Sequence, residues 1–121
     1  MKETLKIGKY DIDLRADGAT PFLYKQAFKK DLIKIFSETF NTGDVGIAGD
    51  IGPELGFVMA QQASSPDPLH VDLSQGTFFN WLAQFEPMDL INSAMDIINI
   101  YLSTYETDST AKKKGEHQTE N

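Results

Sequence analysis

The sequence predicts a mainly helical α+β domain that begins with a β-hairpin and ends in a flexible polar tail. Three observations predict this fold class. Apolar and polar residues alternate over positions 4–15, apolar residues recur at three- and four-residue spacing in four later segments, and the last segment has no large apolar side chain. The chain has 121 residues, enough for one domain with one hydrophobic core. We therefore expect a single domain over residues 1–105 and a tail over 106–121.

The alternation over residues 4–15 predicts a hairpin with one defined register. Gly8-Lys9 would form a two-residue turn, in which Gly8 supplies the positive φ of a type II′ turn. Lys6 then faces Asp11 as an opposite-charge pair on one face of the hairpin. The apolar side chains all fall on the other face: Leu5, Ile7, Tyr10, Ile12 and Leu14.

The first long helix is predicted over residues 20–40, with Thr20 as its N-cap and Pro21 at the first helical position. Its apolar stripe consists of Tyr24, Phe28, Leu32, Ile35 and Phe36. Residues 41–52 contain four glycines and are predicted to form a mobile loop. A second helix, over 53–63, is predicted to open with Pro53.

Two more helices are predicted over residues 74–85 and 87–105. The first is rich in aromatic residues, and Phe79 lies to one side of the face that the other large apolar residues share. That shared face consists of Phe78, Trp81, Leu82 and Phe85. The second helix begins at Pro87, and its apolar stripe is expected to contain Ile91, Ala94, Ile98, Tyr101 and Tyr105, widened by Met88, Met95 and Leu102.

Composition excludes several function classes. The net charge is −7 and Arg15 is the only arginine, so a phosphate backbone is not expected as the main partner. Cysteine is absent, which excludes disulfides, thiolate nucleophiles and cysteine metal sites, and fits a reducing cytoplasm. The first residues do not have the pattern of a signal peptide, and no apolar run is long enough to predict a membrane helix.

Catalytic motifs are not evident, and we expect neither an enzyme nor a bound cofactor or metal. His70 and His117 have no partner at ligand spacing. The glycine-rich segment 43–50 lacks the Gly-Lys-Ser/Thr ending of a phosphate-binding loop, and its two aspartates would repel phosphate. A small hydrolase is a third hypothesis, which is disfavoured because the sequence shows no convincing pair of a nucleophile and a general base.

Two groups of residues are candidates for contact with a protein partner. The aromatic group offers more apolar surface than one core-facing stripe requires, although a fully buried helix would explain it equally well. The lysine group could bind an acidic surface, although a solvated helix face is the simpler explanation. The candidate residues are Phe79, Trp81 and Phe85 in the first group and Lys25, Lys29 and Lys34 in the second.

With these elements placed, the chain resembles the tail assembly chaperones of long-tailed bacteriophages of Gram-positive hosts, over roughly residues 19–105. Residues 19–32 carry the Thr-Pro, Leu-Tyr, Phe and Asp series that opens the first long helix of family members. Many relatives have Gly where this chain has Lys29. The predicted hairpin also fits the family, and shorter similar segments are residues 57–62, 81–85 and 89–91.

The resemblance implies a non-enzymatic chaperone that binds the tape measure protein, a long helical chain prone to aggregation, and helps to recruit tail tube subunits. It also implies self-association, action in the host bacterial cytoplasm and absence from the mature virion. The alternative is a small acidic regulator that binds a nucleic-acid-binding protein and presents carboxylates in place of phosphates. The net charge of −7 motivates this alternative, and the scattered placement of the acids counts against it.

Overall fold

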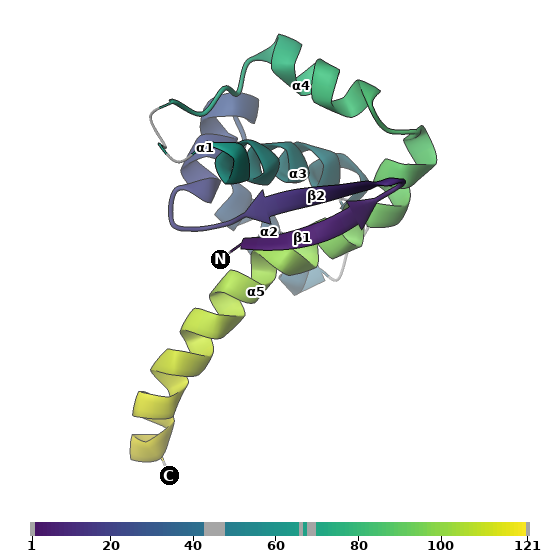
Figure 1. The fold of residues 1–121 in the computed structure, drawn as a ribbon. Coiled ribbons are helices and arrows are strands. Elements are labelled where there is room, and N and C mark those ends of the chain that lie inside the picture. Colours follow the sequence, from purple (N-terminus) through teal and green to yellow (C-terminus); the bar gives the residue numbers. More distant parts are fainter. Residues whose placement is uncertain (1, 43–47, 66, 68–69, 121) are drawn as a thin grey trace.

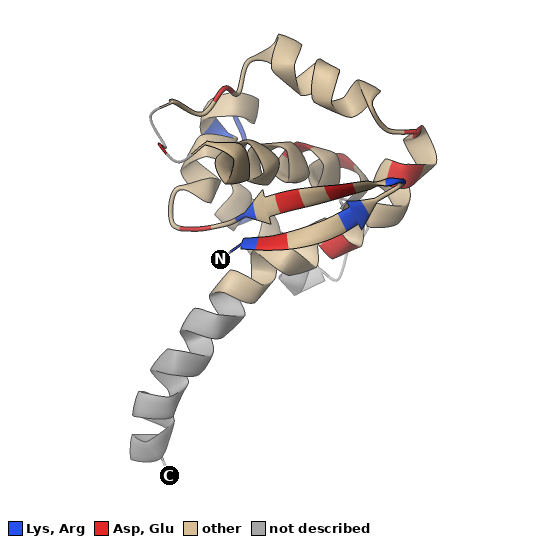
Figure 2. Ribbon diagram, viewed as in Figure 1, with Lys and Arg blue, Asp and Glu red and all other residues tan. Residues whose placement is uncertain are grey.

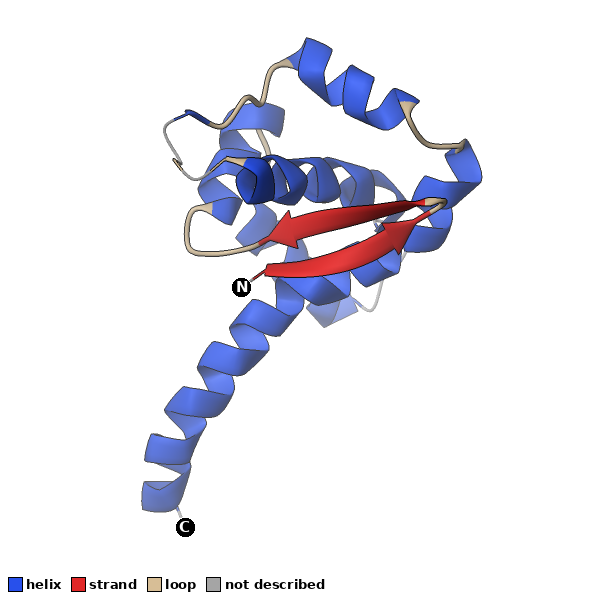
Figure 3. Ribbon diagram, viewed as in Figure 1, coloured by secondary structure: helices blue, strands red, loops and turns tan. Residues whose placement is uncertain are grey.

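The computed structural model describes residues 2–42, 48–65, 67 and 70–120, and their side chains except at 39–42, 48 and 105–120. The domain is a two-stranded hairpin followed by five helices, with the hairpin lying over α3 and α5 (Figure 1). Helices make up most of the chain (Figure 3). The elements are β1 (Lys2–Ile7), β2 (Tyr10–Arg15), α1 (Thr20–Phe28), α2 (Leu32–Thr42), α3 (Ala48–Ser64), α4 (Gln75–Ala83) and α5 (Pro87–Glu120).

The hairpin has the predicted register. Ile7 pairs with Tyr10 and Leu5 pairs with Ile12, so Gly8 is the first residue of the two-residue turn, and its φ is +62°. The predicted apolar face packs against the helices, with Ile7 and Leu14 fully buried. Tyr10 differs, because its ring is exposed at the edge of this face. The hydrophobic alternation and the turn residue therefore fix which face of the hairpin becomes core.

The predicted single helix over residues 20–40 is wrong, because the chain breaks between α1 and α2. Lys29 takes the left-handed conformation, with φ 60° and ψ 30°, and its N–H bonds to the carbonyl oxygen of Lys25 at 2.8 Å to close α1. A carboxylate oxygen of Asp31 then accepts the N–H of Lys34 at 3.1 Å, at the start of α2. Apolar spacing continues across this break, so periodicity alone does not reveal it.

Thr20 is the first residue of α1 and not its N-cap, which is Ala19. Its buried hydroxyl accepts the N–H of Asp17 at 2.9 Å and donates to the side-chain oxygen of Gln62 at 2.7 Å. The Gln62 amide nitrogen donates in turn to the Asp17 carboxylate at 3.1 Å. This network ties the start of α1 to α3, because each buried polar group has a partner.

The predicted loop over residues 41–52 is wrong in its last part, because α3 begins at Ala48, before Pro53. Residues 43–47 lie outside the described part of the chain. Gly52 faces α5, where a Cβ on it would lie 2.6 Å from the Cβ of Ala94. Gly56, one turn later, faces Ile97 and Trp81. Glycine is typical of loops, but it also allows close approach between packed helices because it has no side chain. Gly52 and Gly56 have this second role where α3 meets α5.

The last two predicted helices are α4 and α5. The Ser74 side chain accepts the N–H of Thr77 at 3.3 Å and caps α4. α5 begins at Pro87, and the Asp89 carboxylate accepts the N–H of Glu86 at 3.0 Å. Its helical backbone runs to Glu120, beyond the end predicted near residue 105. The side chains there lie outside the described part, so the mobility of residues 106–121 stays a prediction.

The core lies where α3 meets the hairpin, α1 and α5. α3 contributes more of its fully buried side chains than any other element, because it contacts each of these elements and also α4. The buried apolar residues are Ile7, Leu14, Ala16, Tyr24, Leu32, Phe36, Ile51, Leu55, Phe57, Val58, Met59, Ala60, Trp81, Phe85, Ala94, Ile97, Ile98 and Tyr101.

Candidate partner-binding surfaces

The three aromatic candidates of α4 and its C-terminal turn lie in two different environments. Trp81 and Phe85 are buried, and their ring centroids are 5.0 Å apart. Both belong to the core, which corrects the expectation that they are available to a partner. Phe79 is 54% exposed, as its position beside the shared apolar face predicts. Of the aromatic candidates, Phe79 alone presents a large free surface.

A pocket of about 320 Å³ opens between α1 and α4, with Phe79 on its wall. Phe28 and Phe78 also line this pocket, with ring centroids 5.0 Å apart. Five of the seven lining residues are apolar, and Glu54 and Gln75 add polar groups, so the pocket suits a side chain with an apolar body. The residues that line it are Ala27, Phe28, Glu54, Leu73, Gln75, Phe78 and Phe79.

Glu54 is the one acidic group of this pocket, and two neighbours occupy its carboxylate. The Tyr24 hydroxyl donates to Oε1 at 2.6 Å, and the Lys30 ammonium lies 2.8 Å from the same oxygen. Burial, followed by the hydrogen bond and the charge of Glu54, raises the pKa of Tyr24 far above its ordinary value. The Glu54 carboxylate is therefore already balanced by a hydrogen-bond donor and a positive charge.

The lysine candidates do not form one helix face. Lys25 lies on α1, Lys29 lies at the break after it, and Lys34 lies on α2. All three are exposed. Lys29 donates to the carbonyl oxygen of Gln26 at 3.0 Å, and Lys30 pairs with Glu54. The break turns the predicted stripe into positive charges on two separate helices.

The hairpin carries both acidic and basic residues, as Figure 2 shows: three acids lie among four basic residues, and each acid on β2 has a lysine of β1 near it. Lys2 lies 3.9 Å from Asp13, and Lys6 is the cross-strand partner of Asp11. A mimic of nucleic acid would present carboxylates in a row, like successive phosphates. The hairpin therefore gives no support to the alternative of a regulator that replaces nucleic acid.

An apolar stripe is exposed on α5 at positions that the sequence assigned to the core. Met88 is 58% exposed, Ile91 62% and Met95 46%. Their spacing of three and four residues places them on one face of the helix. The core takes Ile97 instead, together with Ala94, Ile98 and Tyr101. We call Met88, Ile91 and Met95 the α5 stripe. The prediction that these residues belong to the core-facing stripe of the helix is wrong, because all three are exposed.

The histidine prediction is tested only in part, because the side chain of His117 lies outside the described residues. His70 is exposed, and its Nδ1 lies 2.5 Å from a carboxylate oxygen of Asp67. Within the described residues, no group of three or more histidine, aspartate or glutamate side chains could hold a metal ion. No helix of the described part combines the length and hydropathy that a membrane crossing requires.

Comparison with known proteins gives no match: no protein-family model, no curated protein and no solved structure is similar to this chain.

Proposed function

We propose that the chain is a non-enzymatic phage tail assembly chaperone that binds the tape measure protein and helps to recruit tail tube subunits. It would act in the cytoplasm of the bacterial host and leave before the virion is complete. The observation that carries this proposal is the α5 stripe, an exposed apolar surface with the spacing of a helix face. The similarity of residues 19–32 to the family supports it independently.

The stripe has the physical properties that a temporary coat requires. Two of its three side chains are methionines, which adapt to irregular partner surfaces because they are flexible and polarisable. Full burial of one such side chain contributes about 1.5–3 kcal/mol, and each is already partly covered. One copy would therefore bind weakly, whereas several self-associated copies along one long helical partner would bind tightly through avidity.

Co-expression with the longest neighbouring gene product of the source genome tests this function. The long partner should become soluble only with this chain, and several copies should co-elute in size-exclusion chromatography with light scattering. A partner that behaves the same alone, together with a monomeric chain, would reject the role.

A charge placed in the stripe tests whether this surface carries the binding. Ile91→Asp should abolish co-elution, because an ionised carboxylate cannot be buried against an apolar partner without a large cost. Ile33→Asp is the matched control, since Ile33 is an exposed isoleucine on α2. Equal loss in both variants, or loss in the control alone, would show that the α5 stripe is not the binding surface.

A further inference from the structure

We propose that the free edge of β1 is a separate binding surface, which takes an extended basic segment of a partner protein as a third strand. Its residues differ from those of the α5 stripe. Binding at this edge can therefore be tested on the purified chain, whatever the outcome for the chaperone role.

The outer edge of β1 offers unpaired backbone groups. In the described part of the chain, β1 pairs with β2 alone. The two-residue turn makes Ile7 and Tyr10 a hydrogen-bonded pair, and such pairs alternate with non-bonded ones along an antiparallel ladder. An edge of this kind is a template for strand addition. The residues that direct N–H and C=O outward are therefore Lys2, Thr4 and Lys6.

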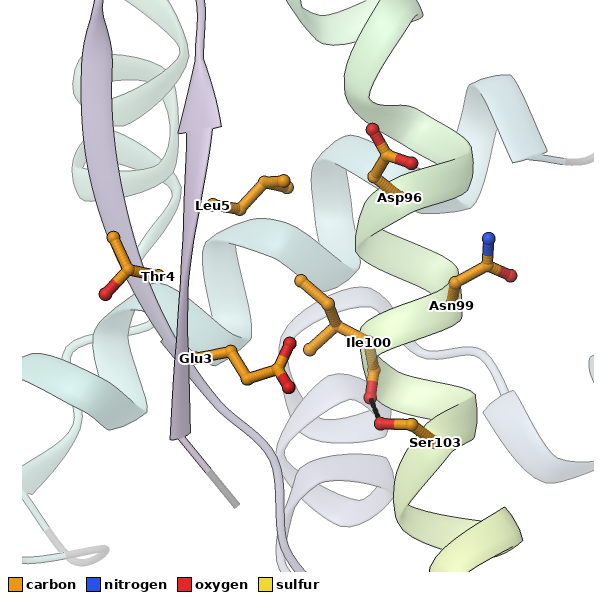
Figure 4. Close-up of a pocket in the computed structure, with 7 residues that line it drawn as sticks. All are labelled: Glu3, Thr4, Leu5, Asp96, Asn99, Ile100 and Ser103. Atoms are coloured by element: carbon orange, nitrogen blue, oxygen red, sulfur yellow. Dashed lines mark hydrogen bonds between the residues drawn. The ribbon is translucent and has the colours of Figure 1, made fainter.

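A groove of about 350 Å³ lies between this edge and α5 (Figure 4). Glu3 and Leu5 point from β1 toward the helix, and Ile100 points back toward them (Figure 4). A strand added about 4.8 Å from β1 would place every second side chain over this groove. The lining residues are Glu3, Thr4, Leu5, Asp96, Asn99, Ile100 and Ser103.

The charge of the groove selects the occupant. Glu3 on β1 and Asp96 on α5 both line it, and neither carboxylate makes a hydrogen bond or ion pair within the described residues. Leu5 and Ile100 supply an apolar part of the same lining. A strand with Lys or Arg two positions from an apolar residue would satisfy both parts, since alternate residues share a face.

A second copy of β1 fits this edge poorly. If two β1 strands paired antiparallel about Thr4, Lys2 of each would lie opposite Lys6 of the other. Like charges directly opposite destabilise a strand pair, and lysines on an edge strand discourage self-pairing. The net charge of −7 also favours a positive partner over another copy of the chain. The occupant is therefore a basic segment of a different protein.

A short, end-blocked peptide that repeats Lys-Thr-Val-Thr, so that Lys and Val share one face of a strand, is the probe. It is titrated into the full-length protein and followed by amide NMR shifts. The largest shifts should fall on Lys2, Thr4 and Lys6, with protection of their amides from exchange, and should weaken with salt. The same peptide with Glu in place of Lys should not bind. Equal binding of the acidic peptide, or shifts confined to other surfaces, would overturn the proposal.

Two proline variants separate the β1 edge from the β2 edge. In Thr4→Pro and Asp13→Pro the lost N–H points away from the β1–β2 ladder, so pairing should persist. Both variants lose the 2.6 Å hydrogen bond between Thr4 Oγ1 and the Asp13 carboxylate. Thr4→Pro should weaken peptide binding on the order of tenfold, whereas Asp13→Pro should not. Equal binding by both variants would reject the β1 edge.

If the proline substitutions disturb the hairpin, a variant with altered charge tests whether the groove binds a basic segment. Glu3→Gln combined with Asp96→Asn changes two exposed residues without changing their shape. We expect binding of the Lys-Thr-Val-Thr peptide to fall severalfold and to lose most of its salt dependence. Unchanged affinity and salt dependence in this folded variant would reject the proposed occupant.

Discussion

Gly8 in the hairpin turn packs directly against the carboxylate of Asp89 in the first turn of α5. A methyl group on Gly8 would overlap that carboxylate. Asp89 also holds the start of α5 through the N–H of Glu86. The contact therefore joins the hairpin turn to the start of α5, two segments that are far apart in the sequence.

Gly8→Ala should lower the free energy of unfolding by about 2 kcal/mol or more. Alanine pays about 1–2 kcal/mol for the left-handed conformation, and its methyl group must also displace Asp89. Gly18→Ala is the control, because a Cβ there meets nothing within 4 Å. Urea unfolding of both variants would measure the difference, and similar midpoints would show that the turn tolerates a side chain.

The hairpin could be predicted from the sequence because alternation, turn residue and charge pairing all require one register. Two of the helix boundaries that were wrong, the break after α1 and the start of α3, depend on signals that periodicity does not contain. Lys29 is not a residue that marks a left-handed helix end, and the glycines before Pro53 are typical of a loop. The spacing of Gly52 and Gly56, four residues apart, is the signal that could have indicated a close helix contact.

The candidate site was predicted less well. Whether an apolar side chain of α5 is exposed depends on which of two apolar stripes of this helix packs against α3. Both stripes have helical spacing: one consists of positions 88, 91 and 95, and the other of positions 94, 97, 98 and 101. The sequence alone does not indicate which stripe is buried. Small residues explain which stripe is buried: Gly52 on α3 packs closely against Ala94, which belongs to the second stripe. Phe79 was separated correctly, because the other four large apolar residues of α4 and its C-terminal turn share one face.

Gly52→Ala should destabilise the protein by about 1–3 kcal/mol. Its methyl group would lie 2.6 Å from the Cβ and 2.8 Å from the Cα of Ala94, and a backbone atom of a packed helix cannot move away easily. Gly49→Ala, in the same helix, is open to solvent and should be neutral or stabilising by up to about 1 kcal/mol. Thermal unfolding of both variants would test this; equal shifts would mean that the close contact is not maintained.

Lys29→Gly should stabilise the protein by about 1 kcal/mol, because glycine adopts the left-handed conformation without the steric strain that a lysine side chain causes there. Lys25→Gly, inside α1, should instead destabilise by about 1 kcal/mol. Chemical denaturation would compare them, and a loss of stability at both positions would mean that α1 does not end at Lys29.

Tyr24→Phe should flatten the loss of stability at high pH. The phenol is neutral when protonated, and burial raises its pKa in the folded state above the ordinary value of about 10. Its contribution is therefore complete below about pH 10 and is lost as the pH rises toward the folded-state pKa, by up to about 1.4 kcal/mol per pH unit. Unfolding titrations would show this, with Tyr10→Phe, at an exposed ring, as the control.

Phe79→Ala should weaken partner binding and leave the domain folded. The ring is 54% exposed, so its removal creates little cavity and should cost at most about 1 kcal/mol of stability. Trp81→Ala should cost about 3–5 kcal/mol, because the indole is buried between Phe57 and Phe85. The two substituted positions are two residues apart on α4, so comparing the variants separates loss of a partner contact from loss of core packing.

Melting temperature and co-elution with the long partner should be measured on both proteins. If Phe79→Ala melts like the wild type and co-elutes less, the pocket between α1 and α4 contributes to partner contact. A large drop in melting temperature would place Phe79 in the core. Unchanged co-elution in a folded variant would remove the aromatic candidates from the partner contact, because the other two are already buried.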